Sequence, residues 1–276
     1  MTLRSRRLGM SLIELIISLV VVSIIGASIT RLLTSQTRFF SKLSLARDAR
    51  SVTRQARNLV QSELSMVDVG AGVVAATRDS ITVRVPVAFG LYCSSNTMMV
   101  LPTDSMYLAS ATLDGFALKD TSAAGAYAYT ALTSTAAGTA TNCTGAGILI
   151  TAPTNGTYRN LTPSPSGTAA SPMFVYQVVT YKFAASTLVS GKLGLWRKAG
   201  TAAYAEIVAP FDTSAKFRFY RLYADTAQSG VPTLTEIRGI ELRLDALAPN
   251  PTPGQNPSRE SSSIRTAIFF RNRTDG

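Results

Sequence analysis

The 276-residue sequence contains no histidine, and this absence excludes several classes of function. Without an imidazole there is no Ser–His–Asp triad, no histidine acid–base catalysis and no histidine-ligated metal. Cysteine is almost as scarce, since only Cys93 and Cys143 are present. Because structural zinc sites draw four ligands mainly from these two residue types, the sequence predicts no metal site.

The motifs of common enzymes and nucleotide-binding proteins are also missing. The sequence has no Gly-x-Ser-x-Gly, and its acidic residues lack the spacing of a calcium loop. Gly70-Ala71-Gly72 follows a predicted helix and lacks a third glycine, while Gly191-Lys192 lacks the other residues of a phosphate-binding loop. We therefore predict a protein that is not an enzyme and needs no cofactor.

The net charge of +11 is concentrated at the N-terminus. Residues 1–57 hold ten Lys or Arg and two acids, which gives +8, and the remaining residues hold seventeen and fourteen, which gives +3. A basic leader beside an apolar segment is a membrane-topology signal. This distribution argues against a nucleic-acid partner, because the bulk of the protein is close to neutral.

Proline is absent before Pro86, and Met10–Thr30 is mainly apolar and has no charged residue apart from Glu14. As a helix these 21 residues are about 31 Å long, which matches the hydrocarbon core of a bilayer. Three arginines precede the run, so the positive-inside rule leaves the N-terminus in the cytoplasm and exports the rest. Arg31 and Arg38 on the far side oppose this orientation mildly.

A cleaved secretory signal is the rival interpretation of the same run, with Gly26-Ala27-Ser28 as its small-residue site. Against it, a helical pattern continues past the run without a break. Apolar residues recur at steps of three and four and predict a buried stripe; they are Leu45, Ala49, Val52, Ala56, Leu59, Glu63 or Leu64, and Val67. We expect one helix from about Ser11 to Val67, ended by Gly70-Ala71-Gly72.

Four arginines recur at steps of three and four on another face of the same predicted helix. They are Arg47, Arg50, Arg54 and Arg57.

The sequence Gly9-Met10-Ser11-Leu12-Ile13-Glu14 joins the basic leader to the apolar helix. This arrangement resembles the prepilin motif of type IV pilins and type II secretion pseudopilins. The resemblance implies that a prepilin peptidase cuts between Gly9 and Met10 and that Met10 is then N-methylated. It covers about the first 60 residues and implies residues 1–9 as leader. With the apolar run and the helical pattern, we expect residues 10–68 as the N-terminal helix, of which 10–30 span the inner membrane.

Glu14 becomes the fifth residue of the mature chain, and an unpaired carboxylate at that depth is costly. The resemblance implies that it pairs with the N-terminal amine of a neighbouring subunit, which sets the register of assembly. The alternative is a bond to the amine of its own Met10, one helical turn away. The two arrangements are compatible if self-pairing in the monomer exchanges on assembly.

The sequence departs from the usual motif at two points; the first is compatible with cleavage, and the second bears on the subtype. Met10 stands where phenylalanine is usual, and the proline common near the membrane exit of major pilins is missing. Together with the length of the chain, a continuous helix favours a minor pilin, similar to the W-type, or a J-type pseudopilin of type II secretion. The expected partners are prepilin peptidase and other pilin helices, before and after assembly into a pilus or pseudopilus. A rival is an adhesin or DNA-uptake pilin.

Residues 72–276 predict a β-rich exported domain. Strand-like runs alternate apolar and polar residues; they are Ile81–Phe89, Ala126–Leu132, Gly147–Thr151, Phe174–Phe183, Lys192–Trp196, Phe217–Tyr223, Ile237–Leu244 and Ile264–Phe270. Pro86 indicates an edge or a bulge, and Pro249–Ser263 an exposed loop. The fold class is therefore α+β, with a mainly antiparallel sheet packed on the helix. In an oxidising compartment Cys93 and Cys143 form one disulfide; otherwise they are two buried thiols.

Overall fold

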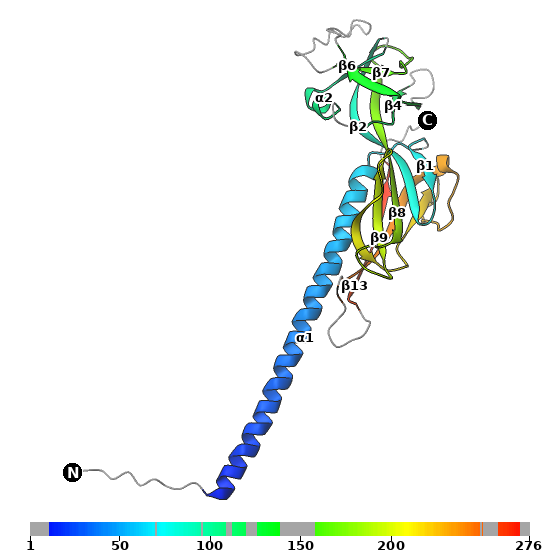
Figure 1. Ribbon diagram of the computed structural model, residues 1–276. Coiled ribbons are helices and arrows are strands. Elements are labelled where there is room, and N and C mark those ends of the chain that lie inside the picture. The colour runs from blue at the N-terminus through cyan, green and yellow to red at the C-terminus, as the bar shows by residue number, and fades with distance from the viewer. Residues whose placement is uncertain are drawn as a thin grey trace, which may run out of the picture.

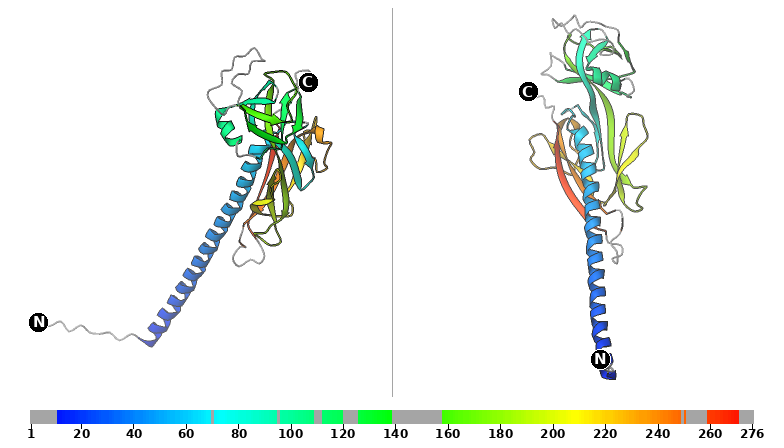
Figure 2. Two further views of the ribbon diagram at one scale, coloured as in Figure 1. Left: turned by 45° about the horizontal axis from the view of Figure 1, so that its top comes forward. Right: turned by 90° about the vertical axis from the view of Figure 1, so that its left-hand side faces the viewer.

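The computed structural model describes residues 11–69, 71–94, 96–108, 112–119, 126–138, 158–248, 250 and 259–270. A single long helix, α1 (Leu12–Leu64), runs out from a β-rich domain that contacts only its C-terminal part (Figure 1). The expected α+β fold is confirmed. The N-terminal end of α1 lies far from the domain in all three views (Figures 1 and 2).

The described residues form one antiparallel sheet with two short helices beside it. The helices are α2 (Pro102–Leu108) and the 3-10 turn η2 (Leu234–Glu236). The strands are β1 (Val73–Ala76), β2 (Ser80–Ser94), β3 (Thr97–Val100), β4 (Gly115–Lys119), β5 (Tyr127–Ala131), β6 (Ser134–Ala137), β7 (Tyr158–Thr162), β8 (Pro172–Ala185), β9 (Leu193–Ala199), β10 (Ala205–Phe211), β11 (Lys216–Arg221), β12 (Ile237–Leu247) and β13 (Ser261–Phe269).

The main path of the sheet runs β11-β12-β10-β9-β8-β2-β3-β7-β6. Strands β1, β4, β5 and β13 pair beside this path, β13 with β12. The long paired strands β2 and β8 run through both ends of the domain. Figure 2 shows an upper and a lower group of strands that this pair connects.

The β2–β8 pair serves two hydrophobic cores. Ile81, Val83 and Val85 of β2 enter the core against α1, and Ala88 and Tyr92 enter a second core beside α2. The change from odd to even positions would turn β2 over if the strand were regular. The register shifts between Pro86 and Ala88, so a bulge keeps both sets of apolar residues on one side. The interpretation of Pro86 as a bulge is confirmed.

The core against α1 closes on one stripe of the helix, made of Leu45, Ala49, Thr53, Ala56, Val60 and Leu64. The prediction differs from this stripe by one residue at two places. Val52 and Leu59 were predicted but are only partly buried at its margin, and Thr53 and Val60 are buried instead. The hydroxyl of Thr53 is buried but donates to the Ala49 carbonyl at 2.8 Å, so its burial leaves no unpaired group. β10, β12 and β13 cover this stripe.

The end of the helix differs from the expectation. α1 ends at Leu64, and Ser65 follows in right-handed helical conformation, with its N–H bonded to the Gln61 carbonyl at 3.1 Å. Gly72 has another role, because a Cβ there would lie 2.3 Å from the Asp68 carbonyl oxygen. Glycine is required at this close approach, several residues after the helix has ended. Gly70 lies outside the described residues.

The last predicted loop is also shorter than expected. β13 begins at Ser261, so Ser261–Ser263 belong to the strand and pair with Leu247–Asp245 of β12. The remainder of Pro249–Ser263 lies mostly outside the described residues, as does the predicted strand Gly147–Thr151.

Candidate functional site

The N-terminal half of α1 is an apolar surface that the rest of the chain leaves uncovered. Every side chain from residue 11 to residue 40 is exposed. The most apolar 18-residue window of α1 has a mean hydropathy of 2.6, and the helix is long enough to cross a membrane. Because exposed apolar area of this extent is unfavourable in water, this surface requires lipid or other helices.

The hydroxyl groups within this apolar surface bond to the helix itself. Ser18 donates to the Leu15 carbonyl at 2.9 Å, and Ser23 donates to the Leu19 carbonyl at 2.8 Å. Ser28 and Thr30 make the same bonds to carbonyls four residues earlier. Each of these four hydroxyl groups is therefore hydrogen-bonded without water, as a helix in hydrocarbon requires.

Glu14 is the only acidic residue between residues 11 and 40. It lies in the first turn of α1, where its backbone N–H donates to the Ser11 carbonyl at 3.0 Å. A carboxylate near a helix N-terminus interacts favourably with the helix dipole. Its side chain is exposed and therefore accessible to a group from a neighbouring helix. The predicted cleavage and methylation residues, Gly9 and Met10, lie outside the described residues.

The domain is fixed to the other end of α1 by an ion pair that the sequence did not indicate. Arg197 of β9 donates from Nη2 to Glu63 Oε1 at 2.8 Å and from Nε to Oε2 at 3.3 Å. Tyr181 of β8 donates its hydroxyl to Glu63 Oε2 at 2.6 Å. Burial raises the pKa of Tyr181, and the Glu63 carboxylate raises it further. One helix residue is thus bonded to two strands.

A second polar contact lies where the chain leaves α1. Asp68 is 5 % exposed and accepts a hydrogen bond from the Tyr129 hydroxyl at 3.2 Å. Burial raises the pKa of Asp68 to about 6, although hydrogen bonds from Tyr129 and the Val69 backbone oppose the change. The Arg84 guanidinium lies 4.7 Å from the Tyr129 ring centroid. This cluster joins the helix exit to β2 and β5.

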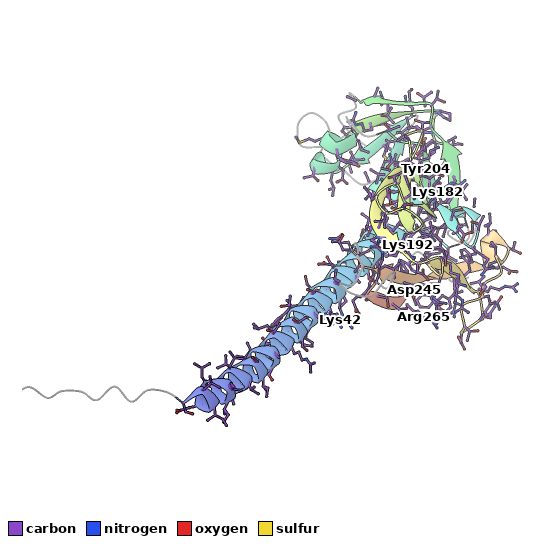
Figure 3. All side chains as sticks on the ribbon, turned by 60° about the horizontal axis from the view of Figure 1, so that its bottom comes forward. Lys42, Lys182, Lys192, Tyr204, Asp245 and Arg265 are labelled. Carbon is purple, nitrogen blue, oxygen red and sulfur yellow. The ribbon has the colours of Figure 1, made fainter. Side chains whose placement is uncertain are left out.

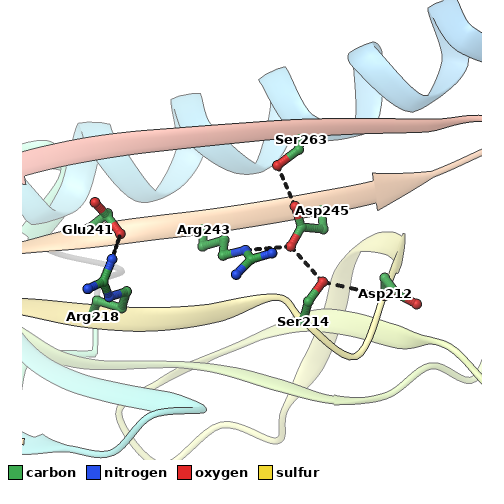
Figure 4. Close-up of polar contacts among 7 residues, drawn as sticks. All are labelled: Asp212, Ser214, Arg218, Glu241, Arg243, Asp245 and Ser263. Carbon is green, nitrogen blue, oxygen red and sulfur yellow. Dashed lines mark hydrogen bonds and ion pairs between the residues drawn. The ribbon is translucent and has the colours of Figure 1, made fainter. Parts of the chain in front are cut away.

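The sheet has its own polar network around Asp245 (Figure 4). Ser214 and Arg243 donate to Asp245 Oδ2 at 2.6 and 2.7 Å, and Ser263 donates to Oδ1. Burial alone would raise the pKa of Asp245, but these three donors lower it. The network ties β12 to β13 and to the turn before β11. A neighbouring ion pair joins Arg218 and Glu241 at 2.8 Å.

Figure 3 shows the side chains of the helix and of the sheet. Side chains project all round α1 beyond the domain, and Lys42 lies on the helix. Asp245 and Arg265 lie on the sheet, and Lys182 Nζ is 3.8 Å from the Tyr204 ring centroid. These sheet contacts are local and structural. Among the described residues, no group of three His, Cys, Asp or Glu side chains is placed to bind a metal ion.

The predicted cysteine pair is seen only in part. Cys93 is buried in β2 at 2 % exposure and is not a free thiol. Cys143 lies outside the described residues, so the pairing of the two remains a prediction.

A long exposed apolar helix, joined through its C-terminal half to an antiparallel sheet, is a pilin-like architecture. The comparison with protein families matches residues 4–30 to the prokaryotic N-terminal methylation motif. No curated protein and no solved structure matches the chain. The motif at residues 4–30 and the long helix packed on an antiparallel sheet support a type IV pilin-like protein. They fit processing by prepilin peptidase, anchoring in the inner membrane and assembly with other pilins.

Proposed function

We propose that this chain is a minor subunit of a type IV pilus-like filament. Residues 1–9 are its leader, residues 10–68 its N-terminal helix and residues 72–276 its exported domain. Prepilin peptidase cuts between Gly9 and Met10, Met10 is methylated, and residues 10–30 hold the subunit in the inner membrane with its domain in the periplasm. The subunit then initiates or caps a filament.

One observation carries this proposal. The helix exposes an unbroken apolar surface with a single carboxylate, Glu14, in its first turn. Burying such a surface between helices is favourable only if the carboxylate meets a cation, and cleavage after Gly9 creates the amine that can supply one. The pairing with a neighbour's amine strongly favours one longitudinal register over slipped ones.

The same surface would serve a J-type pseudopilin in type II secretion. The two systems differ in their other components, so the neighbouring genes decide between them. A retraction ATPase beside this gene supports the pilus, and an outer-membrane secretin with secretion-specific partners supports type II secretion.

The test is incorporation of variants into filaments. Glu14→Leu keeps the helix apolar, so we expect normal insertion and leader removal but little of the variant in filaments sheared from cells. Ser18→Leu is the matched control, because it replaces an exposed polar residue one turn away without removing a carboxylate. Normal recovery of Glu14→Leu in the sheared fraction would show that the register role is wrong.

A further inference from the structure

The C-terminal half of α1 carries a second feature that membrane anchoring does not use. Residues 31–62 contain seven Lys or Arg and one acid, Asp48. Four of these cations form a row on one side of the helix, called here the arginine row. It consists of Arg47, Arg50, Arg54 and Arg57.

The arginine row is accessible, and no acid of the described residues forms an ion pair with it. Arg47, Arg50 and Arg54 are exposed and Arg57 is half-buried. Within the described part of the chain, none of the ion pairs includes a member of the row. The nearest acid in sequence, Asp48, lies about 140° away around the helix axis at 100° per residue. Like charges three and four residues apart also oppose helix formation.

The position of the row on the helix is set by the domain. The stripe that packs on the sheet is centred about 110° from the row around the axis. The row therefore lies on the flank of α1, beside the domain and open to a second molecule. Arg57 is held along the helix by a bond from its Nε to Gln61 Oε1 at 3.2 Å.

Lipid headgroups are too far away to neutralise this row. If the span ends at Thr30, the row begins about 25 Å beyond it and ends about 40 Å beyond it, at 1.5 Å per residue. The headgroup layer adds only about 5 to 8 Å on each side of the hydrocarbon core. Arg31 lies at headgroup height, whereas the arginine row stands at the height of the exported domain.

A second copy of this chain is also a poor neighbour for the arginine row, because like charges would face each other. Two copies anchored in one membrane at the same height bring their rows to the same level. Packed helices lie about 8–10 Å apart, which is close to one Debye length in physiological salt, so the rows repel. A helix with carboxylates at that level would instead be attracted.

We infer that the arginine row is the docking face for a different pilin-like subunit, whose helix carries a row of carboxylates at the same height above the membrane. This inference rests on the proposed function and names the partner it requires. The chain then enters a filament beside an acidic subunit and does not form a homopolymer. Hydrophobic packing of the apolar halves supplies affinity, and the charged rows select the partner.

A charge-reversed copy of this chain serves as the probe. Full-length mature protein and the Arg47→Glu/Arg50→Glu/Arg54→Glu/Arg57→Glu variant are labelled with donor and acceptor dyes and reconstituted in neutral phosphatidylcholine vesicles. We expect energy transfer in the mixed sample to exceed that of either protein alone by about threefold. The excess should disappear in about 1 M salt, where the Debye length falls to about 3 Å.

Two further variants keep the test decisive. Ser44→Glu/Ser51→Glu/Gln55→Glu/Ser62→Glu places four carboxylates on the exposed face turned away from the domain and should give no excess with wild type. A variant with neutral Gln at the four row positions should self-associate more than wild type does. If the charge-reversed variant does not fold, this variant still tests whether the charge of the row controls pairing. Equal transfer with both acidic variants, or strong wild-type self-association, overturns the inference.

Lipid binding is a separate outcome of the same assay. If phosphatidylglycerol-rich vesicles abolish the mixed pairing, the row binds headgroups and the inference is wrong. Intact mass measured on the same samples establishes leader removal independently. A processed chain without selective pairing therefore refutes the docking face alone, and an unprocessed chain refutes the proposed function.

Discussion

Glu63 of α1 and Arg197 of β9 lie 134 residues apart in sequence and meet in a two-bond ion pair, with Nη2 to Oε1 at 2.8 Å. The pair is partly buried, with side-chain exposures of 27 % for Arg197 and 19 % for Glu63. Tyr181 bonds the same carboxylate, so all three groups hold the domain at one height on the helix. This contact and the buried stripe of α1 together set the position of the domain along the helix.

Breaking the pair should loosen the domain from α1. Glu63→Gln or Arg197→Met should each destabilise the protein by about 1–3 kcal/mol, because one charged partner is left partly buried. The double variant should lose less than the sum of the two. Thermal unfolding of the full chain in detergent measures the coupling. Additive losses would show that the two side chains do not interact in solution.

Asp68 predicts an unusual dependence of stability on pH. Its folded pKa of about 6 lies above the ordinary value of 3.8, so the folded state favours the protonated form. Stability from this group is therefore complete below pH 4 and is lost as pH rises through 6. At 1.36 kcal/mol per tenfold change in proton affinity, the loss is at most about 3 kcal/mol.

Asp68→Asn should remove this loss while keeping an acceptor for the Tyr129 hydroxyl. We expect the variant to be more stable than wild type at pH 7 and equal to it near pH 4, as measured by unfolding in denaturant. Tyr129→Phe is a useful comparison, because it removes the bond and leaves the carboxyl. If the stability of Asp68→Asn followed the wild-type pH profile, Asp68 would not be the group with the raised pKa.

Asp245 predicts the opposite sign. Its folded pKa lies below the ordinary value because three donors outweigh the effect of burial, so its contribution to stability is lost as pH falls through that pKa. Asp245→Ala should cost about 1–3 kcal/mol at pH 7, since it leaves Ser263 and Arg243 without this acceptor and leaves Ser214 only its longer bond to Asp212 at 3.4 Å. Hydrogen exchange should then rise first in β13, which is bonded to Asp245 through Ser263. Unchanged protection of β13 would argue against the network.

The parts of the fold that could be predicted have long periodic patterns. α1, β2 and β8 span many turns or alternations, so their type and approximate bounds were readable. β4 (Gly115–Lys119) was missed because four successive residues are buried, which hides the alternation of a strand. β10 (Ala205–Phe211) was missed because it contains Pro210, which argues against a strand in a sequence. The sheet order depends on long-range pairing, for which one sequence carries no signal.

In the candidate site, too, local sequence motifs could be predicted and contacts between distant residues could not. Gly9, Met10 and Glu14 form a local motif beside an apolar helix, so a single sequence could suggest them, and their roles stay predictions; Glu14 lies in the first turn of α1. Glu63 stood only as an alternative to Leu64 within the predicted apolar stripe. The structure buries Leu64 and turns Glu63 to the margin, where its partners come from distant strands. Asp68 likewise depends on Tyr129, 61 residues away.

The central claim is that this chain is a processed pilin-like subunit, and intact mass spectrometry tests it most directly. The protein is expressed in a host that has prepilin peptidase and is extracted from the membrane. The account predicts a mass lacking residues 1–9 and carrying one added methyl group, with fragments that place the methyl on Met10. A chain that retains its N-terminus, or one cut after Gly26-Ala27-Ser28, would contradict the account.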